Sequence, residues 1–154
     1  MIKINVISNN FKWRKYLKKP EVYIEKKVDL INKQQKIYKK KFIYCTLLLS
    51  GDNQIKKLNK KFRKKNKATD VLSFPFYEKR ELYKKLKKDK EIYLGDIIIN
   101  LNKIERKKNI KEFKLAFNKL WLHGLVHLFG YDHKKDKDYL RMIKVEEKLL
   151  AYLN

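Results

Sequence analysis

The chain has few of the residues that mark secreted or membrane-bound proteins. Cysteine occurs once, at Cys45, so no disulfide can form within the chain, which is typical of a reducing compartment. The longest apolar run, FIYCTLLL at 42–49, is far shorter than the roughly 18 to 20 residues that cross a bilayer. The first ten residues, MIKINVISNN, contain neither an uninterrupted apolar stretch nor a small-residue cleavage site. We therefore expect a cytoplasmic protein with no membrane partner, in which Cys45 is a buried small hydrophobic residue.

Glycine and proline are also scarce, with four and two residues, and no stretch rich in proline, glycine or serine divides the chain. No internal repeat is present. Hydrophobic residues make up 44% and charged residues 38% of the 154 positions, so a core can form beneath a heavily charged surface. This length suits one domain and is too short for two. We expect a single domain over residues 1–154.

Acidic residues are few, since 17 Asp and Glu stand against 41 Lys and Arg, and the net charge is +24. Such an excess of cations is typical of proteins that bind nucleic acid. However, only five of the 41 are arginine, whose planar guanidinium is favoured at recognition sites. Because the chain is also rich in Asn, Ile and Tyr, compositional drift of the source is a second explanation for the lysines. The charge alone leaves RNA or DNA binding open.

Four segments have the composition of β-strands. The second is short, continuous and apolar, so we expect it to be covered on both faces. Pro75 cannot donate a backbone hydrogen bond, so the third segment is expected at a sheet edge or ends there. The four segments are IKINVI (2–7), FIYCTLLLS (42–50), TDVLSFPF (69–76) and YLGDIIIN (93–100).

Apolar residues at helical spacing indicate that most of the remainder is helical. Residues 10–40 are expected to form two helices or one helix broken near Pro20, with Ile37 as a less regular last position. Asp52 offers an N-cap for a helix over 52–63. The other expected helices cover 101–108, 111–129 and 136–152, and the charged connection 78–91 is expected to be partly helical. Because strands and helices do not alternate strictly, we predict an α+β fold, with a small mixed sheet of about four strands packed with about five helices.

All three histidines of the chain lie within eleven residues, HGLVHLFGYDH at 123–133. The overlapping segment 113–130 is apolar enough to form a largely buried helix. His123 and His127 are four residues apart, so they project from one face of that helix about one turn apart. The spacing therefore places two imidazoles side by side at the end of a buried helix.

The third histidine follows Gly130, which stands where helices commonly end in a left-handed residue. The reversed backbone would bring His133 to the other two rings. Three neutral imidazoles with a fourth position left open are a recognised catalytic zinc arrangement. Two alternatives are hydrogen-bonded core histidines and a structural zinc, although structural sites usually have four ligands and prefer cysteine.

The spacing H-x-x-x-H-x-x-G-x-x-H matches the ligand frame of metzincin proteases, including the turning glycine. In those enzymes the residue after the first histidine is a glutamate that acts as general base. Here that position is Gly124. Without the proton acceptor, which contributes about 10² to 10⁴ in rate, peptide hydrolysis is the poorer interpretation.

The motif HGLVHLFGYDH is similar to the H-G-x-x-H-L-x-G-Y-D-H signature of the YbeY family of bacterial rRNA-maturation endoribonucleases. Two upstream blocks support the resemblance. LNKKFRKKNKATDVLSFPF (58–76) resembles the family pattern L-N-x-x-[FY]-R followed by T-D-V-L-S-F-P, and LGDIII (94–99) resembles a third block. The blocks keep the family's order. Val126 replaces a leucine that is common at that position, and both residues are apolar.

The resemblance implies an α+β fold and one zinc ion per chain, bound by His123, His127 and His133. It also implies processing or quality control of ribosomal RNA, chiefly at the 3′ end of the small-subunit RNA. Arg63 corresponds to the family's functional arginine, so Arg63 and His123 become the catalytic candidates. The implied partners are rRNA and ribosomal particles, with a ribosomal protein or an assembly GTPase as further candidates.

Arg63 lies within KKLNKKFRKKNK at 56–67, where eight of twelve residues are basic. Its guanidinium can hold two oxygens of the scissile phosphate, while Lys60, Lys64 and Lys67 follow the RNA backbone. The alternative is a solvated helix face that contains an incidental arginine.

Asp132 adjoins His133, so we expect it either to orient that ring or to accept a proton, although Asp and His neighbours often point apart. Together these features predict metal-dependent endonucleolytic cleavage of single-stranded rRNA. One alternative is a ribosome assembly factor with a metal site that binds RNA without cutting it. The other is a metzincin-like peptidase whose base comes from outside the motif.

Overall fold

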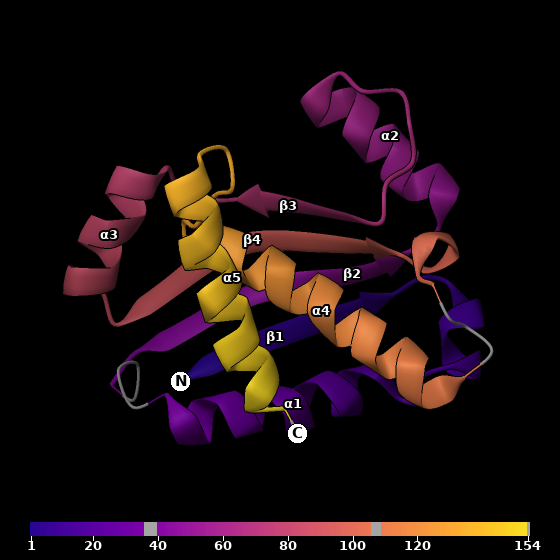
Figure 1. Cartoon of the computed structure of the whole chain (residues 1–154), viewed down its shortest axis with the longest axis horizontal. Coiled ribbons are helices and arrows are strands. Elements are labelled where there is room, and N and C mark those ends of the chain that lie inside the picture. Colours follow the sequence, from indigo (N-terminus) through magenta and orange to yellow (C-terminus); the bar gives the residue numbers. More distant parts are fainter. Residues whose placement is uncertain (36–39, 106–108, 154) are drawn as a thin grey trace.

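A computed structural model describes residues 1–35, 40–105 and 109–153, which fold around one four-stranded sheet (Figure 1). The strand order is β1-β2-β4-β3, in which β1, β2 and β4 are parallel and β3 pairs antiparallel to β4. The predicted α+β class with a mixed sheet is confirmed, and Pro75 ends an edge strand as expected. The strands are β1 (Ile2–Ser8), β2 (Phe42–Ser50), β3 (Val71–Pro75) and β4 (Glu91–Asn100).

Five α-helices pack around this sheet in the described part of the chain. Buried side chains of α1, α4 and α5 join one continuous core with one face of the sheet. The charged connection is helical as expected and forms α3. No helix of the described residues is both long enough and apolar enough to cross a membrane. The helices are α1 (Pro20–Gln34), α2 (Asp52–Arg63), α3 (Lys79–Lys88), α4 (Ile110–Leu128) and α5 (Asp136–Ala151).

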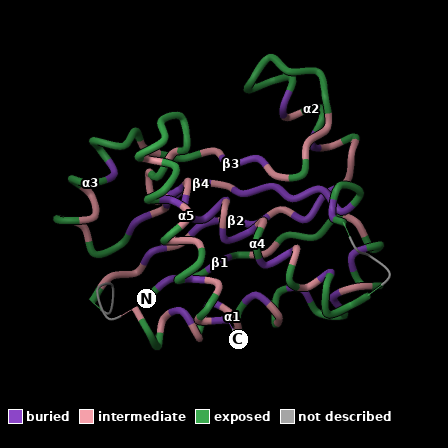
Figure 2. The backbone as a smooth tube through the Cα atoms, in the orientation of Figure 1, coloured by how far each residue is buried: buried purple, intermediate pink, exposed green. Residues whose placement is uncertain are grey.

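The two faces of the sheet are covered unequally, because side chains alternate between the faces along each strand. In β2 the alternate residues Ile43, Cys45, Leu47 and Leu49 are completely buried in the core. Burial raises the pKa of the Cys45 thiol to about 12, as expected for a buried cysteine that acts as a hydrophobic residue. Figure 2 shows the buried backbone concentrated along the sheet, while α2 and α3 are mostly exposed.

The opposite face, called the open face below, is covered at one end only by the residues that the structure describes. There Ile55 of α2 packs with Leu72 and Ile98 of the sheet in a small second cluster. The expectation that β2 is covered on both faces is therefore wrong. Its residues Tyr44 and Thr46 on the open face are only half-buried, because α2 is too short to cover the whole sheet.

The N-terminal helical region differs in detail from the expectation. Residues Phe11–Lys15 form a 3-10 helix, and α1 begins at Pro20, whose fixed φ suits the first helical position. Helix α1 ends at Gln34, so the expected helical position Ile37 lies outside the described residues. In the 3-10 helix, Trp13 is fully buried and its Nε1 donates to the Ser50 carbonyl at 3.0 Å.

Two further expectations are wrong. Gly51, not Asp52, occupies the cap of α2, and Asp52 is its first residue. The segment expected to be helical over 101–108 forms only a 3-10 turn at Leu101–Lys103, and 106–108 lie outside the described residues.

The buried side chain of Asn100, at the end of β4, contacts both segments. Its Nδ2 donates to Asp52 Oδ1 at 2.7 Å and to the Thr69 carbonyl at 3.0 Å. Its Oδ1 accepts from the Asn102 backbone N–H at 3.1 Å. The amide thereby connects the end of β4 to the start of α2 and to the residues that lead into β3.

Candidate metal centre

Helix α4 carries the first two histidines on a rigid support. Asn109 caps its start, because its Oδ1 accepts from the backbone N–H groups of Lys111 and Glu112. Nine of its residues are buried, which confirms the predicted buried helix and holds it firmly against the sheet and α5. His123 and His127 lie in its last two turns and are partly buried.

The turn after α4 brings the third histidine to the other two. Gly130 has φ +85°, a left-handed conformation that favours glycine. The Gly130 N–H donates to the His127 carbonyl and the Tyr131 N–H donates to the Val126 carbonyl, the two hydrogen bonds of a Schellman motif. The predicted reversal is confirmed, and the chain folds back so that His133 lies beside the end of α4.

The three rings converge as the spacing predicts. Ring centroids of His123 and His127 are 4.5 Å apart, and the His133 centroid lies 5.7 Å and 5.0 Å from them. One nitrogen from each ring lies within 4.8 Å of the other two, so the three histidines can hold a metal ion. His133 is exposed, whereas the other two rings are partly buried.

Two neighbouring groups fix the proton positions on the helical histidines. His123 Nδ1 lies 2.8 Å from Glu146 Oε1, and His127 Nδ1 lies 3.0 Å from the Tyr131 carbonyl oxygen. A carboxylate and a carbonyl accept hydrogen bonds, so both Nδ1 atoms donate. When both rings are neutral, both Nε2 atoms then carry lone pairs, and these atoms are 3.1 Å apart. Two lone pairs at this distance repel unless a cation lies between them, so the donor set fits a metal ion.

The surroundings of His127 also favour its neutral form. The pKa of His127 is lowered from its usual 6.5, first by burial and then by repulsion from the neighbouring His123. A neutral imidazole is the form that binds a metal.

Gly124 occupies the position of the metzincin glutamate, and it faces the sheet rather than the cleft. A Cβ built there would lie 2.6 Å from Ile97 Cγ2 of β4. Glycine therefore permits the close approach of α4 to the sheet. A general base at this position would have no room, which agrees with the sequence argument against a peptidase.

Arg63, the last residue of α2, lines the same space as the three histidines. Its Nη2 donates to the Ser73 carbonyl at 3.1 Å, and its guanidinium carbon lies 5.9 Å from the centre of the Phe74 ring. The side chain lines a cleft of about 390 Å³ together with Ser73, Glu146 and the three histidines. We call this space the metal cleft. The structure thus brings together the arginine and the triad, which are about 60 residues apart in the sequence.

A wider space of about 1060 Å³, which we call the lateral groove, shares Arg63, His127 and His133 with the metal cleft. Lys65 lines it, a residue that the sequence argument did not select. The predicted Lys60, Lys64 and Lys67 are exposed around the end of α2 and do not line either space.

The residues around the triad differ from those the sequence singled out. Asp132 Oδ1 accepts from the His133 backbone N–H at 2.8 Å, and its other oxygen lies 3.3 Å from Lys134 Nζ. Asp132 thus fixes the backbone of His133 rather than its ring. The sequence did not single out Glu146, whose carboxylate accepts a hydrogen bond from the His123 ring. A signal for it exists, because Glu146 lies between the buried positions Met142 and Leu149 on the inner face of α5.

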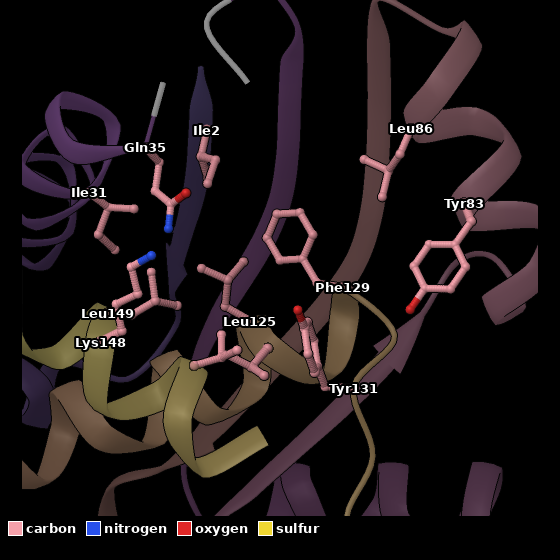
Figure 3. A pocket seen from close by; sticks show the side chains of 12 residues that line it. Ile2, Ile31, Gln35, Tyr83, Leu86, Leu125, Phe129, Tyr131, Lys148 and Leu149 are labelled. Atoms are coloured by element: carbon pink, nitrogen blue, oxygen red, sulfur yellow. The ribbon is translucent and has the colours of Figure 1, made fainter. Parts of the chain in front are cut away.

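A third hollow lies on the other side of α4 and is largely apolar. In Figure 3, the Phe129 ring lies between Leu125 on one side and Tyr83 and Leu86 of α3 on the other. None of its lining residues is a histidine, cysteine or carboxylate, so this hollow offers no donor set for a metal.

Comparisons with known proteins agree with this geometry. The family described as Endoribonuclease YbeY matches residues 7–154. The Endoribonuclease YbeY of Pelagibacter ubique is 43% identical over 155 residues, which cover 99% of this chain and 97% of that protein. The Endoribonuclease YbeY of Thermodesulfovibrio yellowstonii is 34% identical over 162 residues, which cover 99% of this chain and 98% of that protein.

One solved structure has a similar fold. The solution structure of TM1509 from Thermotoga maritima matches with a TM-score of 0.61 and 24% sequence identity, covering 98% of this chain and 89% of that one. The likeness supports the architecture of the sheet and its helices.

Proposed function

Because the chain belongs to the YbeY family of endoribonucleases, we propose that its metal cleft is the active site of a zinc-dependent enzyme that cuts single-stranded rRNA. Membership makes the chain a metal-dependent endoribonuclease of rRNA processing. The choice of zinc, the single-strand preference and the small-subunit 3′ end as target are the finer parts of the proposal. The observation that carries it is the pair of Nε2 atoms 3.1 Å apart in a cleft that also contains an arginine.

His123, His127 and His133 would hold one zinc ion per chain. Imidazole nitrogens suit zinc, and the three rings provide the ligand number of a catalytic rather than a structural site. When bound, the ion supplies Lewis acidity and lowers the pKa of a water to about 7. Glu146 and the Tyr131 carbonyl orient two of the rings through their Nδ1 atoms.

The guanidinium of Arg63 would bind the scissile phosphate. One of its five N–H donors is used by the Ser73 carbonyl, so the group is anchored while other donors remain for phosphate oxygens. Because charge accumulates on those oxygens during cleavage, a fixed cation stabilises the transition state more than the ground state. We therefore assign catalytic roles to Arg63 and His123, and RNA contacts to Lys60, Lys64 and Lys67.

We further propose that the chain acts in the cytoplasm on ribosomal particles, including their quality control, where a ribosomal protein or an assembly GTPase would be its protein partner. Asp132 would support His133 through the backbone hydrogen bond described above. The large excess of positive charge suits a particle whose surface is mainly RNA phosphate.

The test is a defined rRNA precursor incubated with the purified protein, with and without chelator. We expect cutting in unpaired RNA, loss of cutting with chelator and recovery with added zinc. Full cleavage by metal-free protein would contradict the proposal. Salt-dependent RNA binding without product, even after zinc is restored, would instead indicate an assembly factor that does not cut RNA.

A further inference from the structure

The open face of the sheet carries a row of aromatic side chains that the metal cleft does not use. The Phe42 and Tyr44 rings of β2 are 5.4 Å apart, and Tyr44 lies 5.2 Å from Tyr93 of β4. Tyr93 lies 5.6 Å from Phe76, which follows β3. We call these four residues the aromatic row. It crosses the sheet from one central strand to the edge strand.

The rings are accessible, although aromatic residues normally fill cores. Phe76 is 63% exposed, and the other three are half-buried. Helix α2 packs on this face at the opposite end of the sheet, through Ile55 and its partners. Between α2 and the row lies a mainly apolar hollow of about 620 Å³, lined by Leu48, Phe62 and Phe74 among others.

This face is continuous with the metal cleft. Pro75 and Phe76 line both this hollow on the open face and the lateral groove. The lateral groove is also lined by Arg63, His127 and His133. The two spaces therefore meet at the end of β3. An extended chain can run along the open face, past the end of this short strand, and into the cleft.

The charge around the row selects the kind of partner. Lys3 is exposed on the strand next to Tyr44, and Lys65 lines the groove. Lys61 lies 5.2 Å from the centre of the Phe62 ring. Asp96 supplies a carboxylate within the hollow, and its Oδ1 accepts from the Tyr93 hydroxyl at 2.6 Å. Accessible rings and lysines along one continuous surface are an arrangement that binds unpaired nucleic acid, because every base has a face that stacks on an aromatic ring.

We propose that the aromatic row is a second RNA-binding surface, which stacks the bases of single-stranded RNA and guides the strand around the end of β3 into the metal cleft. The choice of RNA as ligand rests on the proposed function. The surface itself lies on the opposite face of the sheet from the triad and adds a contact that the cleft cannot make.

The test measures binding under conditions that prevent cleavage. A fluorescein-labelled single-stranded RNA is titrated with the full chain in the presence of EDTA, and anisotropy gives the affinity. In the double variant Tyr44→Leu and Phe76→Leu, apolar volume is kept but both stacking faces are lost. We expect affinity to fall at least about tenfold for single-stranded RNA, since two stacking partners are removed. Phe11→Leu is the matched control, because Phe11 is 79% exposed but lines neither space.

A second measurement locates the contact. RNA that contains 5-iodouridine is cross-linked to the wild-type chain, and we expect peptides that contain Tyr44 or Phe76 to carry the RNA. If the double variant unfolds at a lower temperature than the wild type, the single variants Tyr44→Leu and Phe76→Ala replace it. Tyr44→Leu then carries the test of the open face, because Phe76 also lines the lateral groove.

Wild-type affinity in the double variant, or cross-links that all lie elsewhere, would overturn the inference and leave the open face to another occupant, such as an apolar surface of a protein. Because the assay reads binding, it is separable from the proposed function. Reduced binding with no cleavage by the wild type would support the aromatic row while refuting the enzyme. Normal cleavage by the wild type, with unchanged binding in the double variant, would support the enzyme while refuting the aromatic row.

Discussion

Helices α4 and α2 both supply the metal cleft, but they do so from opposite physical situations. Nine residues of α4 are buried and its glycine lies against the sheet, whereas α2 buries only Ile55 and Asn59 and ends in a run of exposed lysines. A metal requires ligands at fixed distances, which a buried helix provides. RNA presents repeated charges along a flexible chain, which exposed basic side chains can follow. The two helices should therefore respond differently to substitution.

The largest effect is expected on α4. His127→Ala removes a ligand and leaves two, so stoichiometric zinc and RNA cleavage should both be lost. Elemental analysis and the precursor assay measure the two quantities. Lys111→Ala, at the exposed start of the same helix, should change neither. Retention of one zinc per chain in His127→Ala would show that the triad is not the metal site.

The corresponding change on α2 should separate catalysis from metal binding. Arg63→Ala should lower the cleavage rate about 10² to 10³-fold, the cost of losing one fixed charge at the transition state. Zinc content should remain that of the wild type, because no ligand is changed. Arg63→Lys should recover little, because an ammonium cannot form the paired hydrogen bonds of a guanidinium. A loss of zinc in Arg63→Ala would refute the division between the helices.

A smaller effect is expected from the residue that orients a ligand. Glu146→Gln removes the charge that holds the His123 Nδ1 proton, and zinc affinity should fall about 10 to 100-fold. Competition with a chromophoric chelator gives the affinity. Glu147→Gln is the matched control, since that neighbour on α5 is exposed. Equal affinities in the two variants would leave Glu146 without a role at the site.

The smallest effect should come from the lysines around the end of α2. The triple variant of Lys60, Lys64 and Lys67 to Ala should reduce the slope of log affinity against log salt by roughly 0.7 per lost phosphate contact. Its zinc content should not change. The control triple of Lys19, Lys26 and Lys33, exposed on or next to α1, should keep the wild-type slope. Equal slopes for the two triples would show that the charge of α2 is not part of the RNA path.

The features of α4 could be read from the sequence because they are local. The i and i+4 spacing of His123 and His127, the apolar density of the helix and the position of Gly130 each describe a few neighbouring residues. The convergence of three histidines that could hold a metal therefore follows from eleven residues. The glutamate that completes it was not predicted, because Glu146 reaches His123 through tertiary packing of α5 on α4.

The expectations that failed depend on contacts between distant residues. Asp52 accepts a hydrogen bond from the Asn100 side chain, 48 residues away, and Gly51 occupies the cap of α2, which no local pattern shows. The uneven covering of β2 likewise depends on which part of the sheet α2 overlies. Apolar composition indicated burial but could not show on which face it would be incomplete.

The Schellman turn at Gly130 separates the three histidines by exposure as well as by position. His123 and His127 are partly buried on α4, while His133 stands on an exposed segment after the reversal. A metal held by the triad would be reached from solvent on the side of His133, while His123 and His127 would hold it from the helix. Substitutions in the loop that carries His133 would therefore change the exchange of that metal with solvent more than they change the stability of the fold beneath.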